Sequence, residues 1–182
     1  EIGTFVEREL SDPTATWERV DWLRRLWDGP LVVKGVMSAR DAAEAVRRGA
    51  DAVYVSNHGG RQLDHGRGSM QVLPEIAAAV AGRAKIMVDG SFYRGRDIVK
   101  GIAAGADLVG IGRLQCWALA AAGEAGIVRM LELLEDEVRR CLGLLGFKGL
   151  LINTSWHGRF IDGEDAFPFW EWAEQAQVPL FV

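Results

Sequence analysis

The sequence predicts an α/β fold with four parallel strands, the content of half of a (β/α)8 barrel. Short apolar runs rich in β-branched residues alternate with segments that carry apolar residues at helical spacing. Part of this pattern occurs twice, as a strand, a helix and a second strand with polar residues after it. Alternation alone fits a doubly wound sheet equally well, and the repeated unit is what favours half a barrel.

The repeat is visible at the ends of its strands and helices. The first copy contains Lys34-Gly35, Arg40-Asp41 and Gly49-Ala50-Asp51, and the second contains Asp89-Gly90, Arg96-Asp97 and Gly105-Ala106-Asp107. In each copy a glycine closes the helix and an aspartate precedes the next strand. Loops at the carboxyl ends of parallel strands carry the chemistry of such folds, so the residues after each strand are the candidates for function.

Composition and charge exclude several classes of protein. With 182 residues, of which 49% are hydrophobic and 25% charged, the chain can bury the core of one globular domain. A net charge of −4 without a basic block argues against nucleic acid or an anionic membrane as partner, so we expect a small-molecule ligand. No apolar run reaches the roughly 18 residues of a membrane span and no signal peptide opens the chain, which predicts a cytoplasmic protein.

The two cysteines, Cys116 and Cys141, lie in helix-like segments and lack the spacing of a metal site. We therefore expect core thiols in a reducing compartment, and no metal. The chain does not begin with Met, and its first residues resemble the interior of a longer protein, which predicts a fragment.

The first elements are a helix and a strand. Thr16 is placed to cap a helix that starts at Trp17, and Gly29-Pro30 ends this helix. Residues 31–36 follow as a buried strand. The helix carries an apolar stripe that we expect to pack in the core: Trp17, Val20, Leu23, Leu26 and Trp27.

The later elements follow the same alternation. A capping-box pattern at Ser38 and Asp41 opens a helix that Gly49 closes, and Pro74 suits the start of a helix over residues 75–81. Further strands are predicted over residues 53–55, 85–88 and 108–111, and further helices over residues 94–104, 115–122 and 125–145. The last helix has one apolar face, made of Ile127, Met130, Leu131, Leu134 and Val138.

Three regions follow from this organisation. Residues 1–15 are polar and unpatterned and are interpreted as a loop remnant. Residues 16–150 hold the half barrel. Residues 151–182 form an acidic tail interleaved with aromatic residues, which we expect to pack onto another surface.

The strand over residues 53–55 leads into the most distinctive polar cluster of the chain. Ser56, Asn57, His58 and Arg61 follow it around a pair of glycines. A histidine accepts a proton near neutral pH, and the planar fork of an arginine suits a carboxylate. The residues alone leave two interpretations open, a catalytic His58 or a histidine that is hydrogen-bonded at a strand end.

In order along the chain, several motifs resemble those of the FMN-dependent 2-hydroxy acid oxidase and dehydrogenase family. These motifs are Lys34-Gly35-Val36, the nine residues from Ser56 to Asp64 (SNHGGRQLD), Asp89-Gly90, Ile111-Gly112-Arg113 and Gly123-Glu124-Ala125-Gly126. Glycolate oxidase, lactate oxidase, lactate monooxygenase and mandelate dehydrogenase belong to this family. The resemblance covers about residues 16–150 and corresponds to the C-terminal half of the family's (β/α)8 TIM barrel.

The resemblance implies roles for four residues around the substrate and the flavin ring. His58 matches the active-site base, and Arg61 matches the residue that binds the substrate carboxylate. Lys34 matches the cation beside the pyrimidine edge of the flavin, where it stabilises negative charge that develops on reduction. Ser56 matches a hydroxyl that hydrogen-bonds the flavin.

The resemblance also implies where the ribityl chain and phosphate of FMN bind. The matching residues are Asp89, Gly90, Gly112 and Arg113. The family usually has a second glycine at Ser91, and a phosphate-pairing arginine where this chain has Tyr93. Ser91 adds a side chain where the backbone approaches a ligand, which puts phosphate affinity in doubt unless Arg94 substitutes or the two hydroxyls donate to the phosphate.

The function that the resemblance implies is FMN-dependent oxidation of an L-2-hydroxy acid, such as lactate or glycolate, to a 2-oxo acid. Family members are commonly tetramers, so a homo-oligomer is expected. Because the family's remaining active-site groups lie in the first half of the barrel, we expect little activity from these 182 residues alone. Two alternatives remain, a degenerate or structural barrel subunit without flavin and another FMN-barrel isomerase or reductase.

Overall fold

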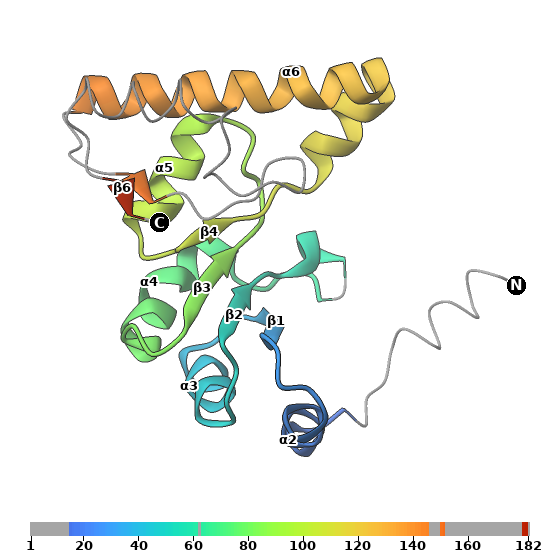
Figure 1. The fold of residues 1–182 in the computed structure, drawn as a ribbon, viewed down its shortest axis with the longest axis vertical. Coiled ribbons are helices and arrows are strands. Elements are labelled where there is room, and N and C mark those ends of the chain that lie inside the picture. Colours follow the sequence, from blue (N-terminus) through green and yellow to red (C-terminus); the bar gives the residue numbers. More distant parts are fainter. Residues whose placement is uncertain (1–14, 62, 146–149, 152–179, 182) are drawn as a thin grey trace, which may run out of the picture.

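Four parallel strands form the centre of the structure, a computed structural model that describes residues 15–61, 63–145, 150–151 and 180–181 (Figure 1). The strands are β1 (Val32–Val36), β2 (Ala52–Val55), β3 (Lys85–Val88) and β4 (Leu108–Val109). They pair in the order β1-β2-β3-β4, so each strand lies next to its neighbour in sequence. This order confirms the predicted α/β fold. It is the order of a barrel segment, because in a doubly wound sheet the order of the strands reverses at a switch point.

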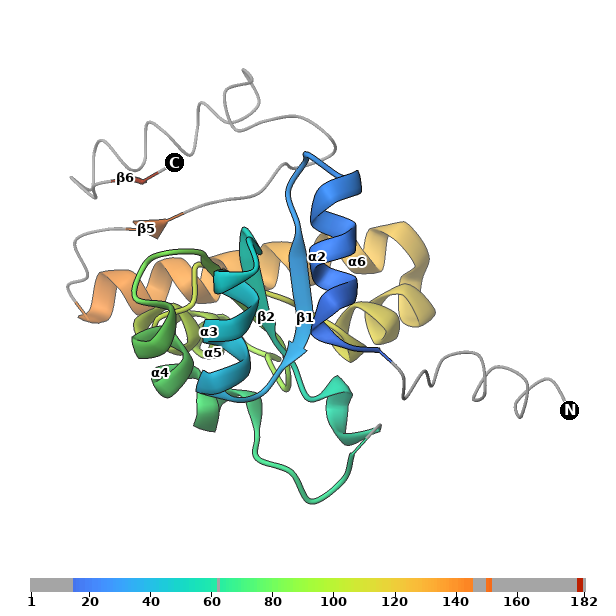
Figure 2. The same ribbon diagram turned by 90° about the horizontal axis from the view of Figure 1, so that it is seen from below.

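Helices connect the strands. They are α2 (Trp17–Leu26), α3 (Ala39–Arg47), α4 (Ser69–Val80), α5 (Gly95–Ala103) and α6 (Arg113–Leu145), with a short 3₁₀ turn, η1 (His58–Gly60), after β2. Figure 2 shows α3 and α4 side by side on one flank of the strands, with α2 beside the edge strand β1. Two further short strands, β5 (Leu150–Leu151) and β6 (Leu180–Phe181), pair with each other in parallel.

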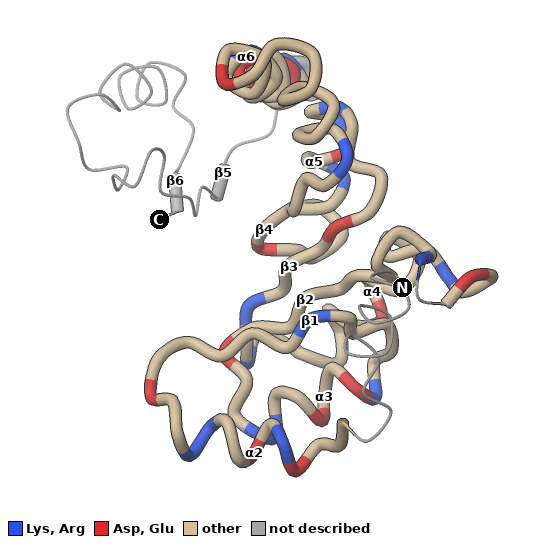
Figure 3. Tube along the Cα trace, turned by 90° about the vertical axis from the view of Figure 1, so that its right-hand side faces the viewer, with Lys and Arg blue, Asp and Glu red and all other residues tan. Residues whose placement is uncertain are grey.

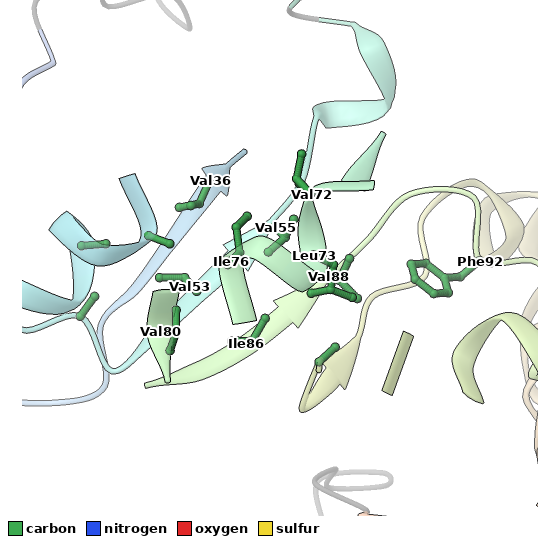
Figure 4. Close-up of a cluster of buried hydrophobic side chains, with 14 residues drawn as sticks. Val36, Val53, Val55, Val72, Leu73, Ile76, Val80, Ile86, Val88 and Phe92 are labelled. Carbon is green, nitrogen blue, oxygen red and sulfur yellow. The ribbon is translucent and has the colours of Figure 1, made fainter. Parts of the chain in front are cut away.

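The core lies between one face of the sheet and the helices packed on it (Figure 4). Ala42 and Ala45 of α3 are fully buried there. The largest fully buried apolar side chains come from two strands and from α4: Val53, Val55, Val88, Val72, Leu73, Ile76 and Val80. Each such side chain stabilises the fold by about 1.5–3 kcal/mol relative to an exposed position. Because successive strand residues point to opposite faces, the residues between the buried valines face the other side of the sheet.

The predicted repeat holds at the level of hydrogen bonds. Gly49 and Gly105 have φ angles of 84° and 107°, which a residue with a side chain rarely adopts. Asp51 and Asp107 each accept a hydrogen bond of 2.8 Å from a backbone N–H in or just before the preceding strand of the repeat. The two glycine–alanine–aspartate motifs are therefore equivalent joints between a helix and a strand.

The prediction that residues 31–36 form a buried strand is wrong about burial. Only Val36 of the five residues in β1 is buried, since within the described chain β1 has a neighbour on one side alone. Most of the apolar stripe of α2 likewise lies outside the core, and only Trp17 packs against the core while partly exposed. No residue of this helix is buried, and Leu26 and Trp27 are 66% and 55% exposed, because little of the described chain covers this flank of β1.

Several predicted boundaries also move. Helix α4 begins at Ser69, well before Pro74, because the Gln71 side chain accepts a hydrogen bond of 2.8 Å from the backbone N–H of Gly68 and closes the first turn. Strand β4 ends at Val109 and not at residue 111. Thr16 occupies the cap position of α2, but its side chain does not bond the helix backbone.

The carboxyl-terminal helix agrees with its two predicted parts. Helix α6 spans both segments, and its backbone departs from helical geometry at Ala122 and Gly123, between them. On the predicted apolar face of α6, Leu131 is 41% exposed. The separate prediction that Cys116 is a core thiol is wrong, because this cysteine is exposed. Residues 1–14 and most of the predicted tail lie outside the described residues.

Charges of both signs are interspersed along the described trace, and α6 lies at the end of the molecule opposite to α2 (Figure 3). No helix among the described residues combines the length and the apolar character that crossing a membrane requires.

The contact between α5 and α6 depends on a missing side chain. A Cβ atom added at Gly95 would lie 2.5 Å from the backbone oxygen of Leu134 and 2.5 Å from the Cβ of Glu137. The two helices therefore approach each other closely only because residue 95 is glycine.

We expect Gly95→Ala to lower the free energy of unfolding by about 2–3 kcal/mol, because the added methyl group overpacks this contact. Gly143→Ala is the matched control, since no atom lies within 4 Å of the added Cβ and alanine favours a helix, so stability should rise by about 0.5–1 kcal/mol. Urea unfolding followed by circular dichroism measures both changes. Equal effects of the two substitutions would contradict the close packing.

Candidate functional site

The carboxyl ends of the first three strands bring a lysine, a serine and an aspartate together. The Nζ atom of Lys34 lies 3.1 Å from the Oγ of Ser56 and 3.5 Å from an Oδ of Asp89. Lys34 is on β1, whereas the other two residues follow β2 and β3 directly. The structure therefore joins three of the residues that the sequence singled out.

A bulge in β1 turns Lys34 toward this cluster. Lys34 pairs with Tyr54, and Val36 pairs with Val55, so Gly35 is an extra residue in the register. Gly35 has a φ of 91°, which glycine tolerates. The bulge lets Val36 enter the core while Lys34 faces the opposite side of the sheet.

His58 sits at the mouth of the cluster on the η1 turn. Its backbone N–H donates a hydrogen bond of 3.3 Å to the Oγ of Ser56, and its φ of 55° is rare for a residue with a side chain. Its imidazole lies against Gly35, where an added Cβ would stand 3.4 Å from the Cε1 atom. Asn57 holds the turn, because its Oδ1 accepts a hydrogen bond of 3.0 Å from the N–H of Gly59.

Arg61 follows the turn but does not join the cluster. Its backbone N–H donates to the carbonyl oxygen of His58 at 3.4 Å. Its side chain is exposed and forms neither a hydrogen bond nor an ion pair with the residues that the structure describes. The guanidinium fork is therefore free to bind an anion that approaches from solvent.

A cavity of about 400 Å³ opens beside the cluster. Glycines of the loops after β2 and β3, the first residues of α4 and two cations line it: Asn57, Gly59, Gly60, Gly68, Ser69, Met70, Gly90, Ser91, Phe92, Asp97, Lys100 and Arg113. The hydroxyl of Ser69 is buried in its wall without a hydrogen-bond partner among the described residues. A buried hydroxyl without a partner is costly, so this position suits a ligand that accepts its hydrogen bond.

The residues predicted to bind the phosphate differ in how they lie around this cavity. Gly90 and Ser91 both have positive φ angles, 113° and 61°, so the serine keeps a conformation that favours glycine. A guanidinium nitrogen of Arg113 comes within 3.9 Å of the position of an added Cβ at Gly59, so this cation reaches across to the η1 turn. The space beside Gly112 is open to 4 Å.

Arg94 is held away from the cavity by α6. Its Nε donates to an Oε of Glu137 at 2.6 Å, and the other Oε accepts from the backbone N–H of Gly95 at 2.7 Å. The hydrogen bond from Arg94 is the main cause of the lowered pKa of the Glu137 carboxyl, and the N–H of Gly95 adds to it. Tyr93 is also engaged, because its ring stacks on Trp117 with centroids 5.6 Å apart.

Carboxylates already occupy the amino end of α5. Besides Glu137, an Oδ of Asp97 accepts from the backbone N–H groups of Tyr93 and Arg94, at 3.3 and 3.1 Å. This helix terminus therefore has little capacity left for a further anion. The amino end of α4, where Ser69 lies, faces the cavity, and Arg113 at the start of α6 also lines it.

Three residues that line or support the site were missed from the sequence. Tyr54 lies under Lys34, with the ammonium nitrogen 4.9 Å from the ring centroid. Its position between two buried valines places it on the inner face, and this alternation could have identified it. Ser69 and Lys100 carried no signal, since a helix-start serine and an exposed lysine are common. Groups of three or more potential metal ligands are absent from the described part of the chain.

Comparison with known proteins gives a consistent picture. The profile of the family described as FMN-dependent dehydrogenase matches residues 2–153. The L-lactate dehydrogenase of Pseudomonas putida strain W619 is 49% identical over 139 residues, which are 76% of this chain and 36% of that protein. The L-lactate dehydrogenase of Pseudomonas aeruginosa strain LESB58 matches with the same identity and coverage.

Solved structures of mandelate oxidase are among those that match. One, a variant with a monooxide FMN adduct, is 48% identical with a TM-score of 0.71, covering 72% of this chain and 42% of the other. Another, bound to (S)-2-phenylpropionate, has the same identity and TM-score and is covered to 40%. This chain thus spans a little over a third of the curated relatives and about two fifths of these structures.

The lowered pKa of Glu137 predicts an acid-sensitive contact between α5 and α6. A carboxyl whose pKa is depressed in the folded state stabilises the fold above its ordinary value of 4.5, and this contribution disappears as the pH falls below 4.5. We expect Glu137→Gln to lower stability by about 1 kcal/mol at pH 7 and by much less near pH 3. Glu135→Gln, which breaks an exposed pair with Arg139, is the control and should cost at most about 0.5 kcal/mol. A loss of stability in Glu137→Gln that does not change with pH would refute the pairing of Glu137 with Arg94.

Proposed function

This chain belongs to the family of FMN-dependent dehydrogenases, and on that basis we propose that it forms part of an enzyme that oxidises an L-2-hydroxy acid to a 2-oxo acid. The observation that carries the proposal is the meeting of Lys34, Ser56 and Asp89 at the carboxyl ends of three neighbouring strands, with His58 beside them. A cation, two hydrogen-bonding side chains and a base therefore lie together at one open edge of the sheet.

The residues around the cavity fit the phosphate end of FMN. Ser69 offers a buried donor without a partner, and Lys100 and Arg113 offer positive charge. A side chain at Gly90 would crowd the hydroxyl of Ser69, since an added Cβ there would lie 3.2 Å from the Oγ of Ser69. The glycine therefore keeps this hydroxyl accessible to a ligand. Asp97 is the opposing charge in the lining, but its carboxylate is engaged at the amino end of α5. A dianionic phosphate suits this combination of groups.

When bound, FMN accepts the two electrons that leave the substrate. Lys34 then has the role of placing positive charge where negative charge develops. Its ammonium group donates to Ser56 and faces Asp89 at the longer distance of 3.5 Å, so it is not neutralised by a tight ion pair. Because its side chain is 42% exposed on the described chain, it remains open to a ligand above the strands.

His58 has the role of the proton acceptor. The Nδ1–Cε1 edge of its ring faces the backbone at Gly35, which leaves Nε2 to take the proton from the substrate hydroxyl. Arg61 has the role of binding the substrate carboxylate through its unpaired fork. Arg94 contributes to stability instead of phosphate binding, since Glu137 holds its guanidinium.

The predictions of a homo-tetramer and of a cytoplasmic location remain part of this proposal. The exposed apolar face of α2, which includes Trp22 and Leu26, supports association with another surface. Light scattering after size exclusion tests the homo-tetramer. Fractionation of cells tests the cytoplasmic location.

The absorbance spectrum of a purified protein that contains this chain tests the reaction. Anaerobic addition of L-lactate, glycolate or L-mandelate should bleach the flavin band, and His58→Ala should slow the bleaching by about 10²- to 10⁴-fold because the base is lost. His65→Ala is the matched control, since this histidine is almost fully exposed in the loop before α4, and it should leave the rate unchanged. A protein that takes up no FMN, or one that bleaches equally fast without His58, would overturn the proposal.

Binding of flavins tests the phosphate site without turnover. Ser69→Ala should weaken FMN binding about tenfold, the loss of one hydrogen bond to a charged group, and leave riboflavin binding unchanged. The flavin-free variant should not be less stable, because the hydroxyl has no partner there. Ser38→Ala removes a hydroxyl that caps α3 at 3.0 Å and should lower stability by about 1 kcal/mol without changing FMN affinity. Equal loss of both flavins in Ser69→Ala would exclude a phosphate contact.

A further inference from the structure

Tyr54 occupies the inner face of β2 directly below the proposed flavin site. It pairs in register with Lys34 on one side and with Met87 on the other. Its ring extends to the residue that follows β4, where a Cβ added at Gly110 would lie 2.0 Å from the phenol oxygen and 3.1 Å from Cζ. The tyrosine therefore fills the volume that a side chain at position 110 would take.

The side chain of Tyr54 lies beside both members of the ion pair, with its ring under Lys34 and its phenol oxygen near Asp89. The ammonium nitrogen of Lys34 lies 4.9 Å from the ring centroid, within the range of a cation–π interaction. The phenol oxygen lies beside Asp89, because the same Cβ added at Gly110 would stand 2.0 Å from the phenol oxygen and 3.3 Å from the Cβ of Asp89. Burial, followed by the negative charge of Asp89, raises the pKa of Tyr54. The tyrosine thus remains a neutral donor at physiological pH.

We propose that Tyr54 is a positioning residue that keeps Lys34 and Asp89 from closing into a tight ion pair. The proposal rests on the function proposed above, in which Lys34 places its charge beside the flavin. The separation of 3.5 Å between Lys34 and Asp89 is longer than the roughly 2.7–2.9 Å of a direct charge-assisted hydrogen bond. The phenol holds the carboxylate from one side while the ring face holds the ammonium group from below.

Removal of the phenol oxygen has a predictable electrostatic consequence. Without this donor, the carboxylate of Asp89 turns its charge toward Lys34, and the positive potential at the proposed flavin position falls. Reduced flavin carries more negative charge than oxidised flavin, so its binding weakens more. A purely structural tyrosine would change stability without changing this difference.

The test is Tyr54→Phe in a purified protein that contains this chain, which keeps the ring under Lys34 and removes only the hydroxyl. Reduced FMN should bind about fivefold more weakly relative to oxidised FMN, which corresponds to a fall of about 20 mV in the two-electron midpoint potential. The potential is measured by equilibration with a reference dye. Met87→Leu, the register partner of Tyr54 on β3, conserves volume and is the matched control with no expected shift.

Gly110→Ala provides a second, independent perturbation from the residue that follows β4. Its methyl group would displace the phenol oxygen, so it should lower the potential in the same direction as Tyr54→Phe. When Gly110→Ala is combined with Tyr54→Phe, it should lower the potential little further, because the phenol oxygen that it displaces is already absent. This arm remains informative if Tyr54→Phe folds poorly.

The outcomes separate the two proposals. An unchanged potential in both Tyr54→Phe and Gly110→Ala, with FMN still bound and only the melting temperature lowered, would overturn the positioning role and leave the proposed function intact. A parent protein that fails to take up FMN at all would overturn both. A lowered potential in either variant with an unshifted Met87→Leu control supports the positioning role.

Discussion

The parallel pairing of β1, β2 and β3 is the constraint on which the rest of the site depends. Parallel strands present their carboxyl ends at one edge, and this places Lys34, Ser56 and Asp89 within hydrogen-bonding or ion-pairing distance. A slip of one residue would turn each side chain to the opposite face. The bulge at Gly35 makes the pairing compatible with a buried Val36, and the φ of 91° at this residue is one that glycine tolerates.

Two surfaces of the chain differ from those of a typical small globular protein. β1 is an open edge within the described chain, and apolar side chains of α2 are exposed beside it. Exposed strand edges and apolar patches of this kind usually belong to interfaces. The chain spans a little over a third of the relatives it matches, and these surfaces suit contact with a further apolar surface.

Under the proposed function, groups from other elements supply the charge for a phosphate that the changed loop does not supply. Ser91 retains a positive φ, so the loop after β3 keeps the backbone path that glycine would give it. The arginine nearest to that loop, Arg94, is committed to Glu137, and the amino end of α5 is filled by carboxylates. Positive charge at the cavity comes instead from Lys100 and Arg113, with Ser69 as a donor. The proposed phosphate site therefore draws its cations and its donor from α4, α5 and α6.

The sequence by itself determined the alternation of strands and helices, the repeated joints at Asp51 and Asp107, and the cluster of polar residues after β2. These features depend on local periodicity and on turn chemistry, which neighbouring residues encode. Only the tertiary structure decided that Arg94 pairs with Glu137, 43 positions later, that Tyr54 fills the space at Gly110, and that the apolar stripe of α2 stays exposed. Such pairings depend on how distant elements pack, and neither spacing nor composition specifies which surface covers another.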